Sequence, residues 1–198
     1  FFDRPFLNEA ARTFLFDQRK LDPRVVSWCR LNSFTDKQGT SWLQIPYYDI
    51  DGHLLGVQNR NLSYQSSSIN NQSSSAPRFK FPYGHTCHIY NLPVLKLLKK
   101  GEPLFITEGA SDCWAMLSSG HKAVAIPSAT LLKPQDLQIL STLNSQLSTV
   151  LHMYPDQDEP GERLFLDLRR LLGSPSSIVR HQLPPDYKDY SDYYLSKH

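Results

Sequence analysis

Cysteine is among the residues that this sequence uses least: three occur in 198 residues, at Cys29, Cys87 and Cys113. Their wide spacing fits neither a disulfide framework nor a zinc motif, so we expect a reducing compartment. The sequence also has little excess of charge of either sign, because its 21 Lys and Arg nearly balance its 19 Asp and Glu, for a formal net charge of +2. A chain this close to neutrality gives no argument for any partner from its overall charge, and a nucleic-acid surface would have to come from local clustering.

Long apolar runs are missing as well. No segment approaches the length needed to span a bilayer, and the opening FFDRPFLNEAARTF has no basic region followed by an apolar core. We therefore expect no membrane partner and a cytoplasmic location. Because the sequence starts without Met, we also expect it to be a piece of a longer protein. Its 40% hydrophobic and 20% charged residues are ordinary for one or two globular domains.

The most informative stretch is LFITEGASDCWAML, which runs from Leu104 to Leu117. A short apolar run leads to Glu108 and Gly109, and apolar residues then recur at helical spacing. This pattern predicts a strand that feeds a helix. The Glu108 carboxylate would lie at the carboxyl end of the strand, where ligands bind in open α/β sheets.

A second acidic turn follows another predicted strand, Ser148–Met153, and reads YPDQDEPG. Side chains two apart in an extended chain point the same way, so Asp156 and Asp158 would face one pocket, together with Glu108. Three carboxylates so near to one another repel each other unless protons or a cation reduce their negative charge. Oxygen ligands suit Mg²⁺ or Mn²⁺, which indicates phosphoryl-transfer chemistry. The alternative is that these acids are solvated turn residues.

Strand and helix patterns alternate over the second half of the chain. Counting the strand before the second acidic turn, three strands are expected after the first, at Lys122–Ile126, Thr149–Met153 and Ser177–Arg180. Helices are expected at Ala110–Ser119, Lys133–Asn144 and Gly161–Leu172. Alternation with short connections predicts an α/β domain with a four-stranded parallel sheet and flanking helices. A helix over Leu92–Lys100, closed by Gly101, marks the expected boundary between domains at 1–97 and 98–198.

The first half of the chain is predicted to be an α+β subdomain. Helical spacing over Phe6–Phe16 indicates one helix, and Asp22 as N-cap with Pro23 at the first helical position indicates a second. The β-prone runs Trp42–Asp49 and His53–Arg60 enclose an Asp-Gly pair, which predicts a β-hairpin.

A basic and aromatic segment, PRFKFPYG, follows a polar loop rich in Ser and Asn. Alternation places Arg78 and Lys80 on one face and Phe79 and Phe81 on the other, where we expect the rings to pack inward. With Arg60 at the end of the hairpin, the two basic residues are candidates for phosphate contacts. The alternative is ordinary surface charge beside core aromatics.

Taken together, these motifs resemble the catalytic core of bacterial-type (DnaG-like) DNA primases, which contains a Toprim domain. Residues 108–112, EGASD, resemble the family's EG-x-x-D, and residues 156–161, DQDEPG, resemble its DGD-x-AG. The turn at residues 127–130 is similar to the family's Ser-x-Gly-Thr turn. The tail from Leu183 resembles its Leu-Pro-x-x-x-Asp-Pro-Asp segment, which makes Asp189 a further candidate ligand.

The resemblance implies a nucleotidyltransferase that makes short RNA primers on single-stranded DNA during replication. Its catalytic and metal-binding acids would be Glu108, Asp156 and Asp158, with Asp189 as a fourth ligand of Mg²⁺ or Mn²⁺. The contacts to template or nucleotide would come from Arg60, Arg78 and Lys80, and the supporting residues would be Gly109, Asp112 and Gly161. The implied partners are a single-stranded DNA template, ribonucleoside triphosphates and, through regions outside this sequence, a replicative helicase.

Two departures from the family pattern lie inside the second acidic turn. Gln157 stands where the family has Gly, and Pro160 stands where it has Ala. We therefore expect a stiffer and bulkier turn, with a consequence for how metal and phosphate fit. Two other interpretations stay open: a Toprim nuclease, and a non-catalytic single-stranded-DNA-binding module of a mobile-element replication protein.

Overall fold

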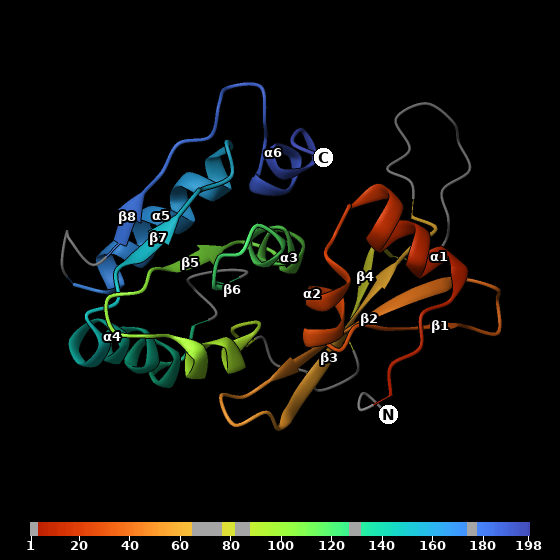
Figure 1. The fold of residues 1–198 in the computed structure, drawn as a ribbon, viewed down its shortest axis with the longest axis horizontal. Coiled ribbons are helices and arrows are strands. Elements are labelled where there is room, and N and C mark those ends of the chain that lie inside the picture. Colours follow the sequence, from red (N-terminus) through yellow and green to blue (C-terminus); the bar gives the residue numbers. More distant parts are fainter. Residues whose placement is uncertain (1–3, 65–76, 82–87, 127–131, 174–177) are drawn as a thin grey trace. The chain divides into compact units, whose positions relative to one another are not determined.

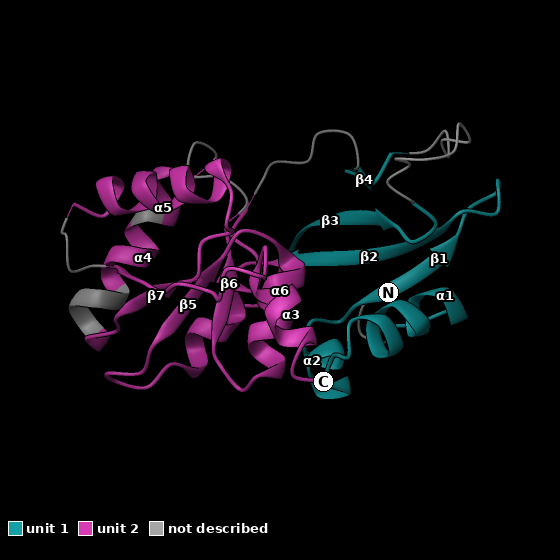
Figure 2. Ribbon diagram, turned by 90° about the horizontal axis from the view of Figure 1, so that it is seen from above, with its two compact units in different colours: residues 1–47, 54–86 teal, residues 48–53, 87–198 magenta. Residues whose placement is uncertain are grey.

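The structure is a computed structural model that describes residues 4–64, 77–81, 88–126, 132–173 and 178–198. The chain divides into two compact units (Figure 2): residues 1–47 and 54–86 form the first, and residues 48–53 and 87–198 form the second. The predicted turn at residues 127–130 lies outside the described residues. The division into functional domains at residues 97 and 98 stays a prediction.

Of the two predicted helices of the first unit, the second begins where the sequence predicts, whereas the helix expected over Phe6–Phe16 begins at Glu9. Helix α1, Glu9–Arg12, is capped by the Asn8 side chain, which accepts a hydrogen bond from the Ala11 N–H. It continues as a π-helical turn, η1, over Thr13–Gln18. Helix α2, Pro23–Trp28, starts after Asp22, whose carboxylate accepts from the Arg24 N–H, so the predicted N-cap is confirmed.

A four-stranded sheet completes the first unit, in the order β1-β2-β3-β4. Its strands are β1 Asn32–Thr35, β2 Ser41–Tyr48, β3 Leu54–Asn61 and β4 Phe79–Lys80. The adjacent strands β2 and β3 confirm the predicted hairpin, and Gly52 in its turn has a φ of +89°, a conformation that glycine adopts without strain. Strand β4 is antiparallel to β3, with Phe79 opposite Arg60.

The second unit contains the predicted four-stranded parallel sheet, in the order β6-β5-β7-β8. The strands are β5 Leu104–Thr107, β6 Ala123–Ala125, β7 Leu151–Met153 and β8 Ile178–Arg180. Because all four run the same way, the segments after β5, β7 and β8 leave the sheet at the same edge. This edge carries the predicted acids.

Helices cover both faces of this sheet. On one face, α4 (Pro134–Leu147), α5 (Glu159–Leu171) and the 3₁₀ turn η2 (Leu92–Leu97) pack against the sheet in a core that includes Leu104, Ile106 and Met153. On the other, α3 (Ala110–Ser118) contacts β5 and β6, and α6 (Tyr190–Leu195) packs beside α3 (Figure 1). None of the described helices is long and apolar enough to cross a membrane.

Two helix predictions in the second unit also need correction. The helix expected at Leu92–Lys100 is a 3₁₀ turn that ends at Leu97; it follows Asn91, whose φ of +64° lies in the left-handed region, and has Pro93 in its first turn. Helix α5 begins at Glu159 rather than at Gly161, because Asp158 is its N-cap. The second correction matters for the site, since one of the predicted ligands is also a helix cap.

Candidate active site

Glu108 lies directly after β5, in the connection to α3. Thr107 shapes this connection: its buried hydroxyl donates to the Gly109 carbonyl at 3.1 Å. The Glu108 Oε1 atom accepts a hydrogen bond from the Asp156 N–H at 3.1 Å, across 48 residues of sequence. Burial raises the pKa of Glu108; the hydrogen bond from Asp156 opposes that change, and the charges of Asp158 and Asp189 add to it.

The pKa of Asp156 is strongly perturbed. Burial raises its pKa to about 8, and the charges of Glu108, Asp112, Asp189 and Asp158 act in the same direction. The structure therefore gathers these acids into one electrostatic environment. At neutral pH such a group holds a proton unless a positive charge replaces it.

Asp158 has two partners in the folded chain. Its Oδ1 accepts from the Gly161 N–H at 3.0 Å as the N-cap of α5, and its Oδ2 lies 3.5 Å from Lys188 Nζ. The cap uses a backbone N–H that would otherwise be free at the start of the helix. Lys188 also lowers the pKa of Glu108, so it is a positive charge of the protein beside these acids.

Asp189 and Asp112 belong to the same region through α6. Asp189 is the N-cap of α6, and its carboxylate accepts from the Asp192 N–H at 2.8 Å. Asp112 is buried on α3, and its Oδ1 accepts from the Ser191 N–H at 2.9 Å. Both carboxylates act on the pKa of Asp156, and both also anchor the last helix.

The two predicted supporting glycines differ in how strictly the structure requires them. A Cβ at Gly161 would lie 2.6 Å from Glu108 Oε1 and 2.8 Å from the Asp156 nitrogen, so the close approach of the acidic turns needs glycine there. At Gly109 the nearest atom to such a Cβ would be Asp112 Oδ2 at 3.4 Å, an ordinary contact.

The donor set at this edge fits a hard divalent cation. The four predicted ligands are all carboxylates. Burial raises the pKa values of Glu108 and Asp156, and the charges of neighbouring acids add to that rise. The carboxylates of Asp158 and Asp189 each accept a hydrogen bond as a helix cap. A carboxylate has further oxygen lone pairs that can bind a metal.

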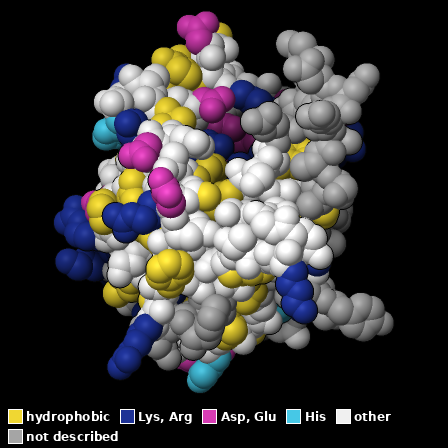
Figure 3. Space-filling view, turned by 90° about the vertical axis from the view of Figure 1, so that its right-hand side faces the viewer, with side chains coloured by type: hydrophobic (Ala, Val, Ile, Leu, Met, Phe, Trp, Pro, Cys, Tyr) yellow, Lys and Arg dark blue, Asp and Glu magenta, His cyan; other side chains and the backbone are white. Residues whose placement is uncertain are grey.

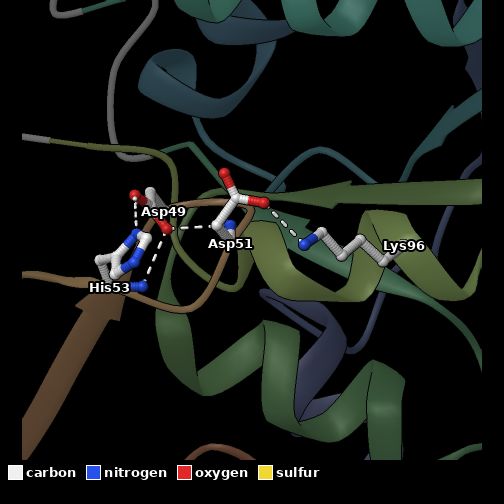
Figure 4. Close-up of polar contacts among 4 residues, drawn as sticks. All are labelled: Asp49, Asp51, His53 and Lys96. Carbon is white, nitrogen blue, oxygen red and sulfur yellow. Dashed lines mark hydrogen bonds and ion pairs between the residues drawn. The ribbon is translucent and has the colours of Figure 1, made fainter.

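Sequence reasoning missed another group, Asp49, Asp51 and His53 (Figure 4). One potential ligand atom from each of these three residues lies within 4.8 Å of the other two, close enough to hold a cation. Among the described residues, no other group of three or more His, Cys, Asp or Glu meets this criterion. The Asp49 carboxylate accepts from the N–H groups of Asp51 and His53, both at 2.9 Å, and Asp51 pairs with Lys96 at 2.7 Å. The two hydrogen bonds to Asp49 stabilise the hairpin turn, which accounts for the closeness of these residues without a bound cation.

Arg60 is the centre of a basic cluster within the first unit. Its guanidinium lies over the rings of Phe14 and Phe79, at 4.8 and 5.4 Å from their centroids. Burial lowers its pKa to about 10, and the charges of Arg19 and Arg78 act in the same direction. In the part of the chain that the structure describes, no ion pair with an acid is found for Arg60 or Arg78, so both can accept an anion.

Arg19 is a member of this cluster that sequence reasoning missed. It lies over the Phe14 ring at 5.4 Å, and its N–H donates to the Phe14 carbonyl at 3.0 Å. This five-residue step is the π-helical hydrogen bond, which places residues i and i+5 together. A search for α-helical spacing could not pair these two residues.

The ring of Phe79 does not pack inward as predicted. Phe79 and Phe81 are 37% and 39% exposed, and the guanidinium groups of Arg60 and Arg78 lie over the Phe79 ring. Lys80 acts on the pKa of Asp36, which lies in the same unit. Basic side chains lie beside hydrophobic ones on the molecular face shown in Figure 3.

Comparisons with known proteins agree with this architecture. Residues 105–194 match the family model described as Toprim-like. The primase fragment of the bacteriophage T7 primase-helicase protein superposes with a TM-score of 0.62 at 14% identity, over 92% of this chain and 69% of that one. The E. coli primase catalytic core gives 0.66 at 16% identity, over 94% and 69%.

A third structure contains DNA. The RNA polymerase domain of Mycobacterium tuberculosis primase DnaG, in complex with a double-stranded DNA oligomer with a 6-nucleotide overhang, gives a TM-score of 0.67 at 17% identity, over 96% of this chain and 70% of that one. A search of curated proteins by sequence found no match.

The second unit is thus a parallel α/β domain with acids at the carboxyl edge of its sheet. More specifically, residues 105–194 form a Toprim-like domain, in a chain that has the fold of DnaG-type primase catalytic cores.

Proposed function

We propose that this chain is the catalytic core of a DNA primase, which joins ribonucleotides on a single-stranded DNA template in a metal-dependent reaction. The observation that carries the proposal is the carboxylate group around Asp156, whose pKa is raised to about 8. A cluster of acids that a metal can relieve of mutual repulsion suits phosphoryl transfer. The Toprim-like domain and the primase-core fold support the same function.

In this proposal, Glu108, Asp156, Asp158 and Asp189 hold Mg²⁺ or Mn²⁺. The bound cation would neutralise the triphosphate and stabilise the charge that develops on the attacking and leaving oxygens. Glu108 fixes the turn after β7 through its bond to the Asp156 N–H, so that the two acidic turns keep their spacing. Gly161 leaves room for that approach, and Lys188 balances part of the negative charge at Asp158.

The basic cluster of the first unit is proposed to bind phosphate groups of the template or of the incoming nucleotide. Arg60 and Arg78 are held on the Phe79 ring, which limits their freedom and keeps their donors available. Lys80 and Arg19 would add charge. Phosphate contacts of this kind give affinity without reading base identity. Association with a replicative helicase, through regions outside this chain, is part of the same proposal, since the T7 relative is a primase-helicase protein.

Calorimetric titration with Mn²⁺ and Mg²⁺, on the preparation used for a primer-synthesis assay, tests the proposal. Wild type should bind saturably and make short RNA products, and Asp156→Ala should lose both. Asp167→Ala is the matched control, because Asp167 lies on α5 in an ion pair with Arg170. Metal-dependent cleavage of labelled single-stranded DNA would favour a nuclease instead. Absence of metal binding in the wild type would refute the catalytic function and leave a DNA-binding module.

Arg78→Gln tests the basic cluster separately. Loss of one phosphate contact to single-stranded DNA should reduce the slope of log affinity against log salt by about 0.7. The decrease in affinity should be the same for templates of different sequence. Arg163→Gln is the control, since Arg163 is exposed on α5 and pairs with Glu159. An unchanged salt slope in Arg78→Gln would exclude Arg78 as a template contact.

A further inference from the structure

Gln157 lies between the two acids of the turn after β7, and its hydrogen bonds all lead to one distant segment. Its backbone N–H donates to the Lys188 carbonyl at 2.7 Å. Its side-chain Nε2 donates to the Pro184 carbonyl at 2.8 Å and also to the Tyr187 carbonyl. The amide is therefore used fully as a donor, although the residue itself is exposed. These bonds connect positions 27 to 31 residues apart.

The segment that receives these bonds delivers two charged groups to the acidic edge. Lys188 places its Nζ 3.5 Å from Asp158 Oδ2, and Asp189 follows as the N-cap of α6. The turn that contains Gln157 supplies the other two acids, Asp156 and Asp158. Gln157 is thus a direct hydrogen-bonded link between the two stretches of chain whose charges must be in register.

Other contacts hold the segment in the fold without Gln157. The Leu183 side chain is 2% exposed, the Tyr187 N–H donates to the Pro184 carbonyl at 3.2 Å, and the Tyr187 ring contacts the Tyr193 ring at 5.4 Å. Loss of the Gln157 side-chain bonds should therefore leave the segment folded. What the bonds add is the position of residues 188 and 189 relative to the turn after β7.

The hydrogen bonds of Gln157 show what this residue adds at the position where the family pattern has glycine. A glycine between the two acids could make the backbone bond to Lys188 but neither of the side-chain bonds. The Gln157 amide is directed to the carbonyls of Pro184 and Tyr187. Compared with glycine, the Gln157 side chain therefore adds two connections to the segment that contains Pro184 and Tyr187.

We propose that Gln157 is a positioning residue, which keeps Lys188 and Asp189 in register with Asp156 and Asp158. The catalytic meaning of this role rests on the proposed metal-dependent function. Residues that orient metal ligands from outside typically change metal affinity by about 10- to 100-fold when removed. Because Gln157 is exposed, where water can replace part of its bonding, we expect an effect near the lower end of that range.

Gln157→Met is the decisive variant, because it keeps the length of the side chain and removes both Nε2 donors. We expect Mn²⁺ affinity, measured by calorimetry, to fall about tenfold with unchanged stoichiometry. Backbone amide exchange, followed by NMR, should become faster at Gln157 and at Tyr187, while the amides of β5 and β7 keep their rates. Gln138→Met on the exposed face of α4 is the matched control and should change neither quantity.

The two readouts separate this proposal from the function on which it rests. If the wild type binds no Mn²⁺, the metal site is refuted, while exchange at Gln157 and Tyr187 still decides whether the link exists. Faster exchange with unchanged Mn²⁺ affinity would show a structural link that does not position the ligands, and would overturn the proposal. Unchanged exchange in Gln157→Met would overturn it as well. Gln157→Glu would place a carboxylate, which only accepts hydrogen bonds, beside two carbonyl oxygens. It should therefore lower the Mn²⁺ affinity more than Gln157→Met does.

Discussion

Asp156→Asn should change how the stability of the metal-free protein depends on pH. The pKa of Asp156 is about 8 in the fold, against an ordinary value of 3.8. Between these values the unfolded chain has lost the proton and the folded chain still holds it, so the free energy of unfolding falls as pH rises. Asparagine has no such proton. The variant should therefore become more stable relative to wild type from about pH 4 to about pH 8, and the difference should then level off.

The magnitude follows from the interval between the two pKa values. Without any solvent screening, an interval of about 4 pH units between the two pKa values corresponds to roughly 6 kcal/mol in the free energy of unfolding. The Asp156 carboxyl is only partly buried, so solvent screening reduces the expected gain at pH 8 to about 2–3 kcal/mol. A gain of that size in a chain of marginal stability is easily measured by denaturant unfolding.

The assay is urea unfolding of wild type and Asp156→Asn in chelator at several pH values between 5 and 8.5. Asp167→Asn is the control, because it changes an acid on α5 without touching the site. Parallel stability curves for wild type and Asp156→Asn over this range would refute the reasoning. Added Mn²⁺ should reverse the order at pH 8, since metal binding to the wild type supplies the missing positive charge.

Two other substitutions probe the packing and charge of the same edge. Gly161→Ala should lower the free energy of unfolding by about 1–3 kcal/mol, because the new Cβ would overlap Glu108 Oε1 and the Asp156 backbone; a higher melting temperature, the usual result of Gly→Ala in a helix, would contradict this. Lys188→Met should raise the pKa of Glu108 further, since Lys188 is a positive charge that lowers it; an NMR titration of the Glu108 side chain gives the answer, and an unchanged pKa would show that Lys188 does not act on this site.

The sheet of the second unit could be predicted because its sequence signals are local. Apolar runs such as Leu104–Thr107 are interrupted by acidic turns and followed by helical periodicity, and parallel alternation leaves few topologies. The acids at the strand ends could be placed near one another by the same logic. The capping function of Asp158 was not predicted, because an acid after a strand and an acid before a helix look alike when the helix start is uncertain by two residues.

The first unit shows what local patterns do not contain. Alternation in the PRFKFPYG segment predicts basic and aromatic residues on opposite faces, yet the Arg78 guanidinium lies over the Phe79 ring. β4 is a two-residue strand, and Phe79 is 37% exposed with two guanidinium groups over its ring. The contact between Arg19 and Phe14 depends on a π-helical turn, and no residue type in the sequence predicts such a turn.

The buried bond between Asp112 and the Ser191 N–H has a consequence for shortening the chain. Asp112 acts on the pKa of Asp156, yet its hydrogen-bond partner lies in the last ten residues. A chain cut before Ser191 would keep all four strands of the parallel sheet but would leave this carboxylate without its backbone donor. Such a truncated protein could retain its secondary structure while its acid–base behaviour changes, so a normal circular dichroism spectrum would not establish an intact site.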